Sequence, residues 1–397
     1  MQIPVPDHAT YRKAFAGQRM PFAYVDFDLF DANVKAVAPL ARGKSIRVAS
    51  KSVRVPELLK RISSYGLPYK GIMCYSAREA DHLAKEGFKD LLIGYPCHHP
   101  DDVNPLLEHV RNGVQLWLMI DSVEHVCHLD SLGRAHGTVV PVCLDMDMST
   151  DLPGLHFGVW RSSVHRPADA RSVAEEIGRC KHVRLDGLMG YEAQIAGLGD
   201  NVPGQAVMNS VVRWLKRISV REISKRRADT VHQIKQMGHE LQFVNGGGTG
   251  SMDTTCLEDC VTEVTVGSGF FAPTLFDNYS GFRFAPAAGY AIEVVRMPKP
   301  GIYTCLGGGY IASGEIGPLK QPSVLFPLGA ELIGQEGTGE VQTPVRYSGE
   351  LKMGDPVFLR HAKAGELMEH FNDVLLLKNG EVVGSAPTYR GLGHKML

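Results

Sequence analysis

The most constraining feature of the sequence is a long alternation of short apolar runs and longer amphipathic stretches, from Phe22 to about Phe271. The short runs are rich in residues that favour strands, and the longer stretches repeat apolar residues at helical spacing. This alternation is typical of βα units around a parallel sheet. Nine candidate strands cover residues 22–27, 45–50, 69–74, 90–95, 116–121, 139–147, 185–191, 241–247 and 260–268. Because one closed barrel needs about this number, a TIM-type (β/α)8 barrel is favoured over an open doubly wound sheet.

The pattern changes after the segment FRFAPAAGY, at about residue 284. From there, short apolar runs are separated by Gly, Pro and an Asn379-Gly380 turn, and helical windows are few. A chain of 397 residues with 44% hydrophobic residues can bury more than one core. The sequence therefore predicts an α/β protein with a barrel domain over residues 1–283 and a C-terminal β-rich domain over residues 284–397.

Composition narrows the kind of partner that the chain can bind. The 42 basic and 43 acidic residues nearly cancel, so no overall field favours nucleic acid or an anionic membrane. A small-molecule ligand is therefore expected. There is no run of about 18 apolar residues and no apolar segment near the N-terminus, which disfavours membrane insertion and secretion. The eight cysteines lack paired spacing, so we interpret them as reduced thiols in a cytoplasmic protein.

Lys51 is the first candidate for chemistry. It follows the candidate strand at 45–50 and precedes Pro56, where a helix is expected to begin. In a barrel this position is the carboxyl end of an early strand, where catalytic groups gather. A lysine there can form an imine with a cofactor or a carbonyl substrate if its surroundings, including Arg47, favour the neutral amine. Most lysines are solvated, however, so Lys51 alone does not establish a site.

Two clusters of small residues are candidates for binding an anion. The loop NGGGTGS, at 245–251, follows an apolar run and combines unobstructed backbone amides with two hydroxyls. The next apolar run ends in a second cluster at 267–269. In TIM-type barrels, phosphate often binds in the loops after the last two strands, where both clusters are expected. Each cluster alone could be an ordinary turn, and neither completes a P-loop or a dinucleotide-binding fingerprint.

Four segments, taken together and in order, resemble the fold-type III enzymes that use pyridoxal 5'-phosphate (PLP). The resemblance is to the group of D-threonine aldolases and D-serine dehydratases, which shares its barrel with alanine racemases, and it spans nearly the whole chain. The segments are MPFAYVDFDLFDANV, RVASKS, GGGTGS and TEVTVGSGFF. The resemblance implies a (β/α)8 barrel that carries PLP, a C-terminal β-domain, and a homodimer whose sites lie near the subunit interface.

The same resemblance suggests which residues hold the cofactor. Lys51 would form the Schiff base with PLP, and Arg47 belongs to the same strand-end motif. Arg161 resembles an arginine close to the oxygen edge of the cofactor, although a surface guanidinium is the plainer interpretation. Tyr191 resembles the residue beside the pyridine ring. The residues that would hold the phosphate are Gly247, Gly248, Thr249, Gly267 and Ser268.

The chain departs from the family pattern near its C-terminus. The related aldolases and dehydratases carry a His-x-Asp or His-x-Cys pair that holds a divalent metal ion, whereas this chain has His361-Ala362-Lys363. A lysine ammonium is not a metal ligand, so the two-residue metal signature is absent. Two alternatives are open. Residues between Glu366 and Asp373 rebuild a metal site with His361, or His361 or Lys363 acts directly as an acid or base.

Taken together, the sequence predicts a PLP-dependent lyase that cleaves a β-hydroxy amino acid into an amino acid such as glycine and an aldehyde. Lys51, Arg161 and His361 are the expected catalytic residues. A dehydratase or an amino acid racemase would share the linkage to Lys51 and differ in the acid and base groups around it. A non-catalytic PLP-binding protein is a further alternative. Proteins of that kind are usually single barrels, so the β-rich domain argues against it.

Overall fold

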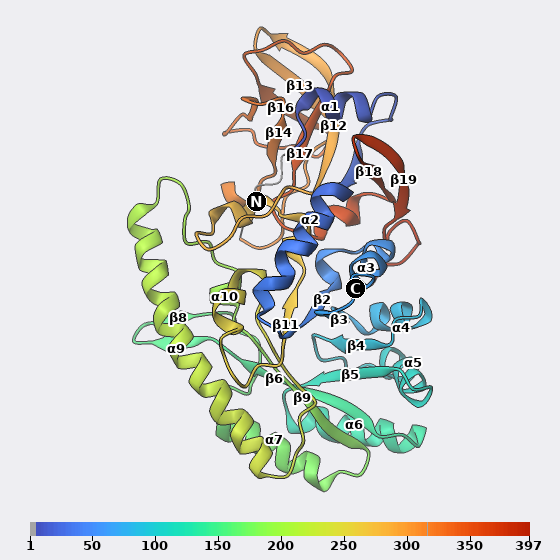
Figure 1. Ribbon diagram of the computed structural model, residues 1–397, viewed down its shortest axis with the longest axis vertical. Helices are drawn as coiled ribbons and strands as arrows, with labels where there is room; N and C mark the ends of the chain where they lie inside the picture. Colours follow the sequence, from blue (N-terminus) through green and yellow to red (C-terminus); the bar gives the residue numbers. More distant parts are fainter. Residues whose placement is uncertain (1–4, 316) are drawn as a thin grey trace. The chain divides into compact units, whose positions relative to one another are not determined.

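The computed structural model describes residues 5–315 and 317–397 of the chain (Figure 1). Contacts within the chain divide these residues into two compact units, each built from segments that are separate in sequence. The barrel unit comprises residues 38–51, 59–267 and 396–397. The sheet unit comprises the described residues up to Val37 together with residues 52–58 and 268–395.

The barrel unit contains a closed barrel of eight parallel strands, which confirms the predicted (β/α)8 fold. In order around the barrel, the strands are β2 (Ser45–Ala49), β3 (Tyr69–Cys74), β4 (Asp90–Ile93), β5 (Gln115–Ile120), β6 (Val140–Asp147), β9 (Val183–Tyr191), β10 (Phe243–Gly246) and β11 (Glu263–Val266). A buried apolar cluster takes side chains from successive strands, including Leu92, Trp117, Cys143, Met189 and Phe243. These side chains pack together in the barrel interior, as expected for this fold.

Helices follow the strands as the sequence pattern predicts. They are α3 (Pro56–Ser63), α4 (Ala77–Lys85), α5 (Pro100–Arg111), α6 (Val123–His136), α7 (Pro167–Arg179), α8 (Ala193–Ala196), α9 (Ala206–Gln236) and α10 (Met252–Thr255). Ser76 and Ser122 cap α4 and α6, because each hydroxyl oxygen accepts a hydrogen bond from an otherwise unbonded backbone amide. A short antiparallel hairpin, β7 (Thr150–Leu152) and β8 (Leu155–Phe157), lies between β6 and α7. None of the helices among the described residues combines the length and apolar character needed to cross a membrane.

The sheet unit is built around a sheet of nine strands among its described residues, as expected for the β-rich part of the chain. Its strands are β1 (Phe22–Asp26), β12 (Ala288–Lys299), β13 (Ile302–Leu306), β14 (Ser323–Phe326), β15 (Glu331–Leu332), β16 (Gln342–Arg346), β17 (Pro356–Arg360), β18 (Asp373–Lys378) and β19 (Glu381–Pro387). Its helices include α1 (His8–Ala14), α2 (Phe27–Val37) and α11 (Ser268–Phe271). The predicted Asn379-Gly380 turn joins β18 to β19, and both residues have positive φ.

One of the nine candidate barrel strands lies in the other sheet. β1 pairs with β12 in antiparallel orientation and with β18 in parallel orientation, so its assignment to the barrel was wrong. All five residues of β1 are buried, and two of them, Phe22 and Tyr24, join an aromatic cluster with Tyr11 and Phe358. An apolar run indicates that a strand is buried, but it does not indicate which other strands that strand pairs with. The predicted domain boundary between residues 283 and 284 stays a prediction.

Candidate active site

Lys51 lies in η2 (Ser50–Ser52), the single turn that directly follows β2. The buried hydroxyl of Ser50 fixes the start of this turn. It lies 2.8 Å from the carbonyl oxygen of Met73 on β3 and 2.8 Å from a carboxylate oxygen of Glu79 on α4. The structure therefore places Lys51 at the carboxyl end of the barrel, on a turn that is held by neighbouring elements.

Tyr95 is the residue beside Lys51 that the sequence reasoning missed. It follows β4, and its hydroxyl oxygen lies 3.3 Å from Nζ of Lys51. The Tyr95 side chain is 42% exposed, so one part of it reaches solvent. A signal was present, because the candidate strand at 90–95 ends at Tyr95, and all carboxyl ends of a parallel barrel meet at one rim.

Arg161 joins the same group of residues. Its guanidinium carbon lies 5.0 Å from the ring centroid of Tyr95 and 5.8 Å from that of Tyr191, at the end of β9. Its Nε donates to Asp145 at 2.7 Å, and its Nη2 donates to the carbonyl oxygen of Gly94 at 2.8 Å. Arg161 is therefore held in place at the carboxyl end of the barrel, and the interpretation as an ordinary surface guanidinium does not fit its contacts.

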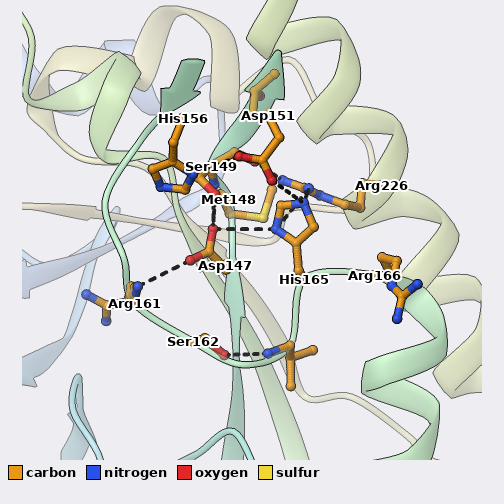
Figure 2. A network of polar contacts seen from close by, with 12 residues as sticks. Asp147, Met148, Ser149, Asp151, His156, Arg161, Ser162, His165, Arg166 and Arg226 are labelled. Atoms are coloured by element: carbon orange, nitrogen blue, oxygen red, sulfur yellow. Dashed lines mark hydrogen bonds and ion pairs between the residues drawn. The ribbon is translucent and has the colours of Figure 1, made fainter. Parts of the chain in front are cut away.

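Asp147, the last residue of β6, organises the segment that carries Arg161 (Figure 2). One of its carboxylate oxygens accepts hydrogen bonds from the amide and the hydroxyl of Ser149, and the other accepts the backbone amide of Arg161 at 3.2 Å. Nδ1 of His165 lies 3.7 Å from the same carboxylate, and Arg226 lies 2.7 Å from Nε2 of that histidine. These contacts fix the backbone around Arg161, and the carboxylate of Asp145 fixes its side chain.

The pKa values of the ionisable groups around Arg161 are shifted in different directions. Burial by itself would raise the pKa of Tyr95, but the nearby charges of Lys51 and Arg161 outweigh it and lower that pKa from its ordinary value. Burial raises the pKa of Tyr191 to about 12. Burial also raises the pKa of Asp145 to about 7, although Arg161 opposes this shift. Tyr95 is therefore the phenol of this group that loses its proton more readily, whereas Tyr191 keeps its proton at neutral pH.

Arg47 lies inside the barrel and is 1% exposed. Its Nε and Nη2 donate to the two carboxylate oxygens of Glu263, at 2.7 Å and 3.0 Å, and its Nη1 donates to Asp90 at 2.6 Å. Three strands, β2, β4 and β11, are thereby joined by one guanidinium. Arg47 supports the strand that precedes the turn carrying Lys51, and its predicted contact with a cofactor stays a prediction.

The glycine loop after β10 is held by a buried carboxylate, that of Glu192. This carboxylate accepts the backbone amide of Gly247 at 3.2 Å and the hydroxyl of Ser251 at 3.1 Å, and it also accepts the hydroxyl of Thr255. Arg227 on α9 donates to it at 2.9 Å. The amide of Gly247, which the sequence assigns to a phosphate, therefore has a partner within the protein.

The same loop contacts the group around Arg161 through Gly248. A Cβ atom at Gly248 would lie 3.0 Å from the Cβ of Ala196 and 3.3 Å from the ring of Tyr191. Thr249, the next residue, begins the single turn η3 (Thr249–Ser251). Lys51, Tyr95, Arg161, Tyr191 and the glycine loop thus form a continuous chain of contacts in the barrel unit.

The second cluster of small residues spans the point in the sequence where the chain passes from the barrel unit to the sheet unit. Gly267 ends the barrel segment after β11, and Ser268 begins α11 in the sheet unit. Within the sheet unit, the hydroxyl of Ser268 lies 3.3 Å from that of Ser52. The predicted roles of Gly267 and Ser268 in holding a phosphate stay predictions.

His361 follows β17 in the sheet unit and is 2% exposed. Neither ring nitrogen makes a hydrogen bond of normal geometry with the described residues. Burial, reinforced by the positive charge of Arg360, lowers the pKa of His361 to about 3, so the imidazole is neutral at neutral pH. Lys363 is in different surroundings, since its ammonium group is partly exposed and donates to Ser313 at 2.9 Å.

The residues near His361 that could rebuild a metal site have other partners. Glu366 accepts hydrogen bonds from Ser313, and Glu369 pairs with Arg54 at 2.7 Å. His370 stacks on Tyr310. Across residues 5–315 and 317–397, no group of three or more His, Cys, Asp or Glu side chains is arranged to hold a metal ion. A divalent metal at His361 stays a prediction.

Comparison with known sequences gives a family for the barrel. Residues 25–230 match the model of the alanine racemase N-terminal domain. The 3-hydroxy-D-aspartate aldolase of Paracoccus denitrificans (strain Pd 1222) is 21% identical over 236 residues, which are 58% of this chain and 54% of that protein. The D-threonine aldolase of Arthrobacter sp is 21% identical over 271 residues, which are 68% of this chain and 65% of that protein. The match thus spans little more than half the length of the first of these relatives.

Solved structures give the fold of nearly the whole chain. D-threonine aldolase from Filomicrobium marinum superposes with a TM-score of 0.79 at 16% identity, covering 94% of this chain and 95% of that one. D-threo-3-hydroxyaspartate dehydratase from Delftia sp. HT23 superposes with a TM-score of 0.73 at 18% identity, covering 94% and 98%. At these identities the superpositions show that the chain has the same fold.

Proposed function

The chain belongs to the alanine racemase N-terminal domain family, and we propose that it is a PLP-dependent lyase that cleaves a β-hydroxy amino acid. The products would be an amino acid such as glycine and an aldehyde, as for a D-threonine aldolase. The observation that carries this proposal is the contact between Lys51 and Tyr95 at the barrel rim that also holds Arg161. The names of the two curated relatives support the choice of an aldolase.

The residues at this rim fit PLP. Lys51 offers a primary amine on a fixed turn, and Arg161 offers a cation beside two aromatic rings. A side chain at Gly248 would crowd this rim, since a Cβ there would lie 3.3 Å from the ring of Tyr191. When bound, PLP supplies an electron-withdrawing ring that makes a bond at the α-carbon of an amino acid easier to break.

The residues of the chain would divide the remaining work. Arg161 would bind an oxygen of the ligand, because its contacts with Asp145 and Gly94 keep the guanidinium in one orientation. Tyr191 keeps its proton at neutral pH and can donate a hydrogen bond. Thr249, together with Gly248, Gly267 and Ser268, would hold the phosphate. Gly247 would contribute through its positive φ, since Glu192 binds its amide.

His361 is the proposed acid or base for the substrate hydroxyl. A neutral imidazole can accept a proton, and it is also the form that binds a metal ion. Its burial and lowered pKa keep it neutral at neutral pH, the form that both roles require, and make it a weak base in the structure as it stands. A chelator separates the two roles, because only cleavage that uses a bound metal ion will stop when the ion is removed.

The test is turnover of a panel of D- and L-β-hydroxy amino acids by the PLP-loaded protein, with and without chelator. Aldehyde and glycine are the expected products. Oxo acid and ammonia would make the protein a dehydratase, and an inverted amino acid would make it a racemase. Turnover of none of these substrates by a protein that holds PLP would favour the non-catalytic alternative.

We also propose that the protein is a homodimer located in the cytoplasm, with an amino acid as its small-molecule substrate. The family resemblance supports the dimer, and the eight cysteines, all free in the structure, fit a reducing compartment. Light scattering of the purified protein tests the oligomeric state. A molar mass equal to that of one chain would contradict the dimer.

A further inference from the structure

We infer that Tyr95 is a catalytic residue that takes a proton from the Lys51 ammonium group and later returns it, while Arg161 stabilises the phenolate. The inference rests on the proposed function, because it concerns the step in which Lys51 becomes a nucleophile. A lysine reacts only as a neutral amine, so a residue that removes its proton has a direct effect on this step.

The geometry brings the two reacting atoms together. The hydroxyl oxygen of Tyr95 lies 3.3 Å from Nζ of Lys51, a distance at which a modest adjustment gives a hydrogen bond that can transfer a proton. The same nitrogen lies 5.8 Å from the centroid of the Tyr95 ring, so its shorter approach is to the hydroxyl and not to the ring face. Tyr95 therefore contacts Lys51 with the group that can accept the proton.

Arg161 is placed to favour the phenolate of Tyr95. Its guanidinium carbon is 5.0 Å from the centre of the Tyr95 ring, and its Nη2 donates to the carbonyl oxygen of Gly94, the residue just before Tyr95. The arginine is thus tied to the backbone that carries the tyrosine. A fixed cation next to a phenol stabilises the ionised form, which agrees with the lowered pKa of Tyr95.

The other ionisable groups of this rim do not cancel the effect. Among the described residues, the ionisable groups shown to act on Tyr95 or to respond to it are Lys51 from η2, Arg161 from the segment after β8, and Tyr191 from the end of β9. Two are cations, and Tyr191 is a neutral phenol because burial raises its pKa to about 12. The carboxyl group of Asp145 contacts Arg161. Burial raises the pKa of Asp145 to about 7, so the negative charge of this carboxyl group is reduced at neutral pH.

The proton transfer balances without any further reactant. An N–H bond of the Lys51 ammonium group breaks, its electron pair stays on nitrogen, and an O–H bond forms on the Tyr95 phenolate. The products are a neutral amine and a neutral phenol. When Lys51 is later released as a free amine, the phenol gives the proton back, and Tyr95 is again a phenolate beside Arg161.

The first experiment follows the reaction of Lys51 with PLP in the PLP-free protein from about pH 6 to about pH 10. Borohydride reduction traps the linkage, and peptide mass spectrometry locates it. Tyr95→Phe keeps the ring and removes only the hydroxyl. Tyr347→Phe, in the sheet unit, is the control, because this variant keeps the same number of tyrosines as Tyr95→Phe. We expect Tyr95→Phe to slow the labelling of Lys51 at neutral pH by about tenfold or more, and to move the rate profile to higher pH.

Each outcome separates the inference from the proposed function. Labelling of Lys51 with the same pH profile in the wild type and in Tyr95→Phe would overturn the role of Tyr95 and leave the proposed function intact. Absence of labelling at Lys51 in every variant would overturn the proposed function itself.

A second measurement does not depend on the folding of Tyr95→Phe. Phenolate ultraviolet absorbance is titrated in the wild type and in Lys51→Met, which removes one of the two cations beside Tyr95. One phenol should ionise at lower pH than the others in the wild type and move to higher pH in Lys51→Met. An identical titration in both proteins would refute the coupling between Lys51 and Tyr95.

Discussion

The two units of the molecule bury ionisable side chains in opposite ways. In the barrel unit, the two most deeply buried arginines among the described residues pair with carboxylates: Arg47 with Glu263 and Asp90, and Arg227 with Glu192 and Glu258. In the sheet unit, His361 is buried with no hydrogen bond of normal geometry to its ring among the described residues. Burial costs the charged form free energy unless an opposite charge compensates it. Arg47 and Arg227 therefore keep their charges in the barrel unit, whereas His361 loses its charge.

This difference shows what controls the ionisation of Tyr95 and of His361. At the barrel rim, fixed cations decide which neighbouring group ionises, so the pKa of Tyr95 is lowered although burial opposes the shift. At His361, burial comes first and lowers the pKa to about 3, so the neutral imidazole is available over the whole neutral range. Tyr95 is tuned by neighbouring charges, whereas His361 is tuned by desolvation. The two can therefore be perturbed separately, by changing a partner or by changing pH.

The largest effect is expected from Lys51, on which the chemical role of the barrel rim depends. Lys51→Ala should abolish both the visible absorption of bound PLP and all turnover, because no other amine replaces its linkage to the cofactor. Lys60→Ala is the control, since Lys60 is a half-exposed lysine that pairs with Glu86 on the surface. A visible spectrum in Lys51→Ala that matches the wild type would disprove the assignment of the cofactor to this lysine.

The pairing of charges in the barrel unit predicts a large loss of stability when one partner is removed. Arg227→Leu leaves the buried carboxylates of Glu192 and Glu258 without their cation, so the free energy of unfolding should fall by about 3 to 5 kcal/mol. Arg221→Leu, an exposed position on the same helix, should change it by less than about 0.5 kcal/mol. Chemical denaturation measures both. Equal losses in the two variants would show that the buried ion pairs are not what stabilises the glycine loop.

For His361 the comparison predicts a dependence of stability on pH. The pKa is depressed in the folded protein, to about 3 from an ordinary 6.5, so between these values the unfolded chain binds more protons. This contribution to stability is complete above pH 6.5 and is lost as the pH falls. Between pH 7 and pH 5 the loss should be about 2 kcal/mol. In His361→Gln that part of the dependence should disappear, whereas the exposed control His232→Gln should keep it.

Denaturation is measured at both pH values, because a change in unfolding free energy that His361→Gln causes equally at pH 7 and pH 5 then cancels. The informative quantity is the difference in unfolding free energy between pH 7 and pH 5 within each variant. If His361→Gln and the wild type lose the same stability on acidification, the imidazole titrates normally and burial does not tune it.

How far the sequence predicts the fold depends on the kind of signal each element carries. The eight barrel strands were found because parallel strands alternate with helices at regular spacing, and β1 was misplaced because its five residues are buried in either sheet. Lys51 and Arg161 could be named from their motifs. Tyr95 ends a predicted strand, but nothing in the sequence ranks it, Asp145 or Glu192 above many similar residues, because their roles come from contacts between segments far apart in sequence.

The smallest effect on stability is expected at Asp147, because its carboxylate accepts hydrogen bonds from several donors. Asp147→Asn replaces a carboxylate oxygen by an amide nitrogen in the network that holds Ser149 and the Arg161 backbone (Figure 2), so one hydrogen bond is lost and others remain. The free energy of unfolding should fall by about 1 kcal/mol. Asp151→Asn is the matched control, because Asp151 belongs to the same network but its side chain is 62% exposed, and it should have almost no effect. A larger loss in Asp151→Asn than in Asp147→Asn, measured by urea denaturation, would contradict the view that buried partners hold Arg161. If the expected order is found, the loss in free energy of unfolding caused by a mutation in the barrel unit increases with the burial of the charge that the mutation leaves unpaired.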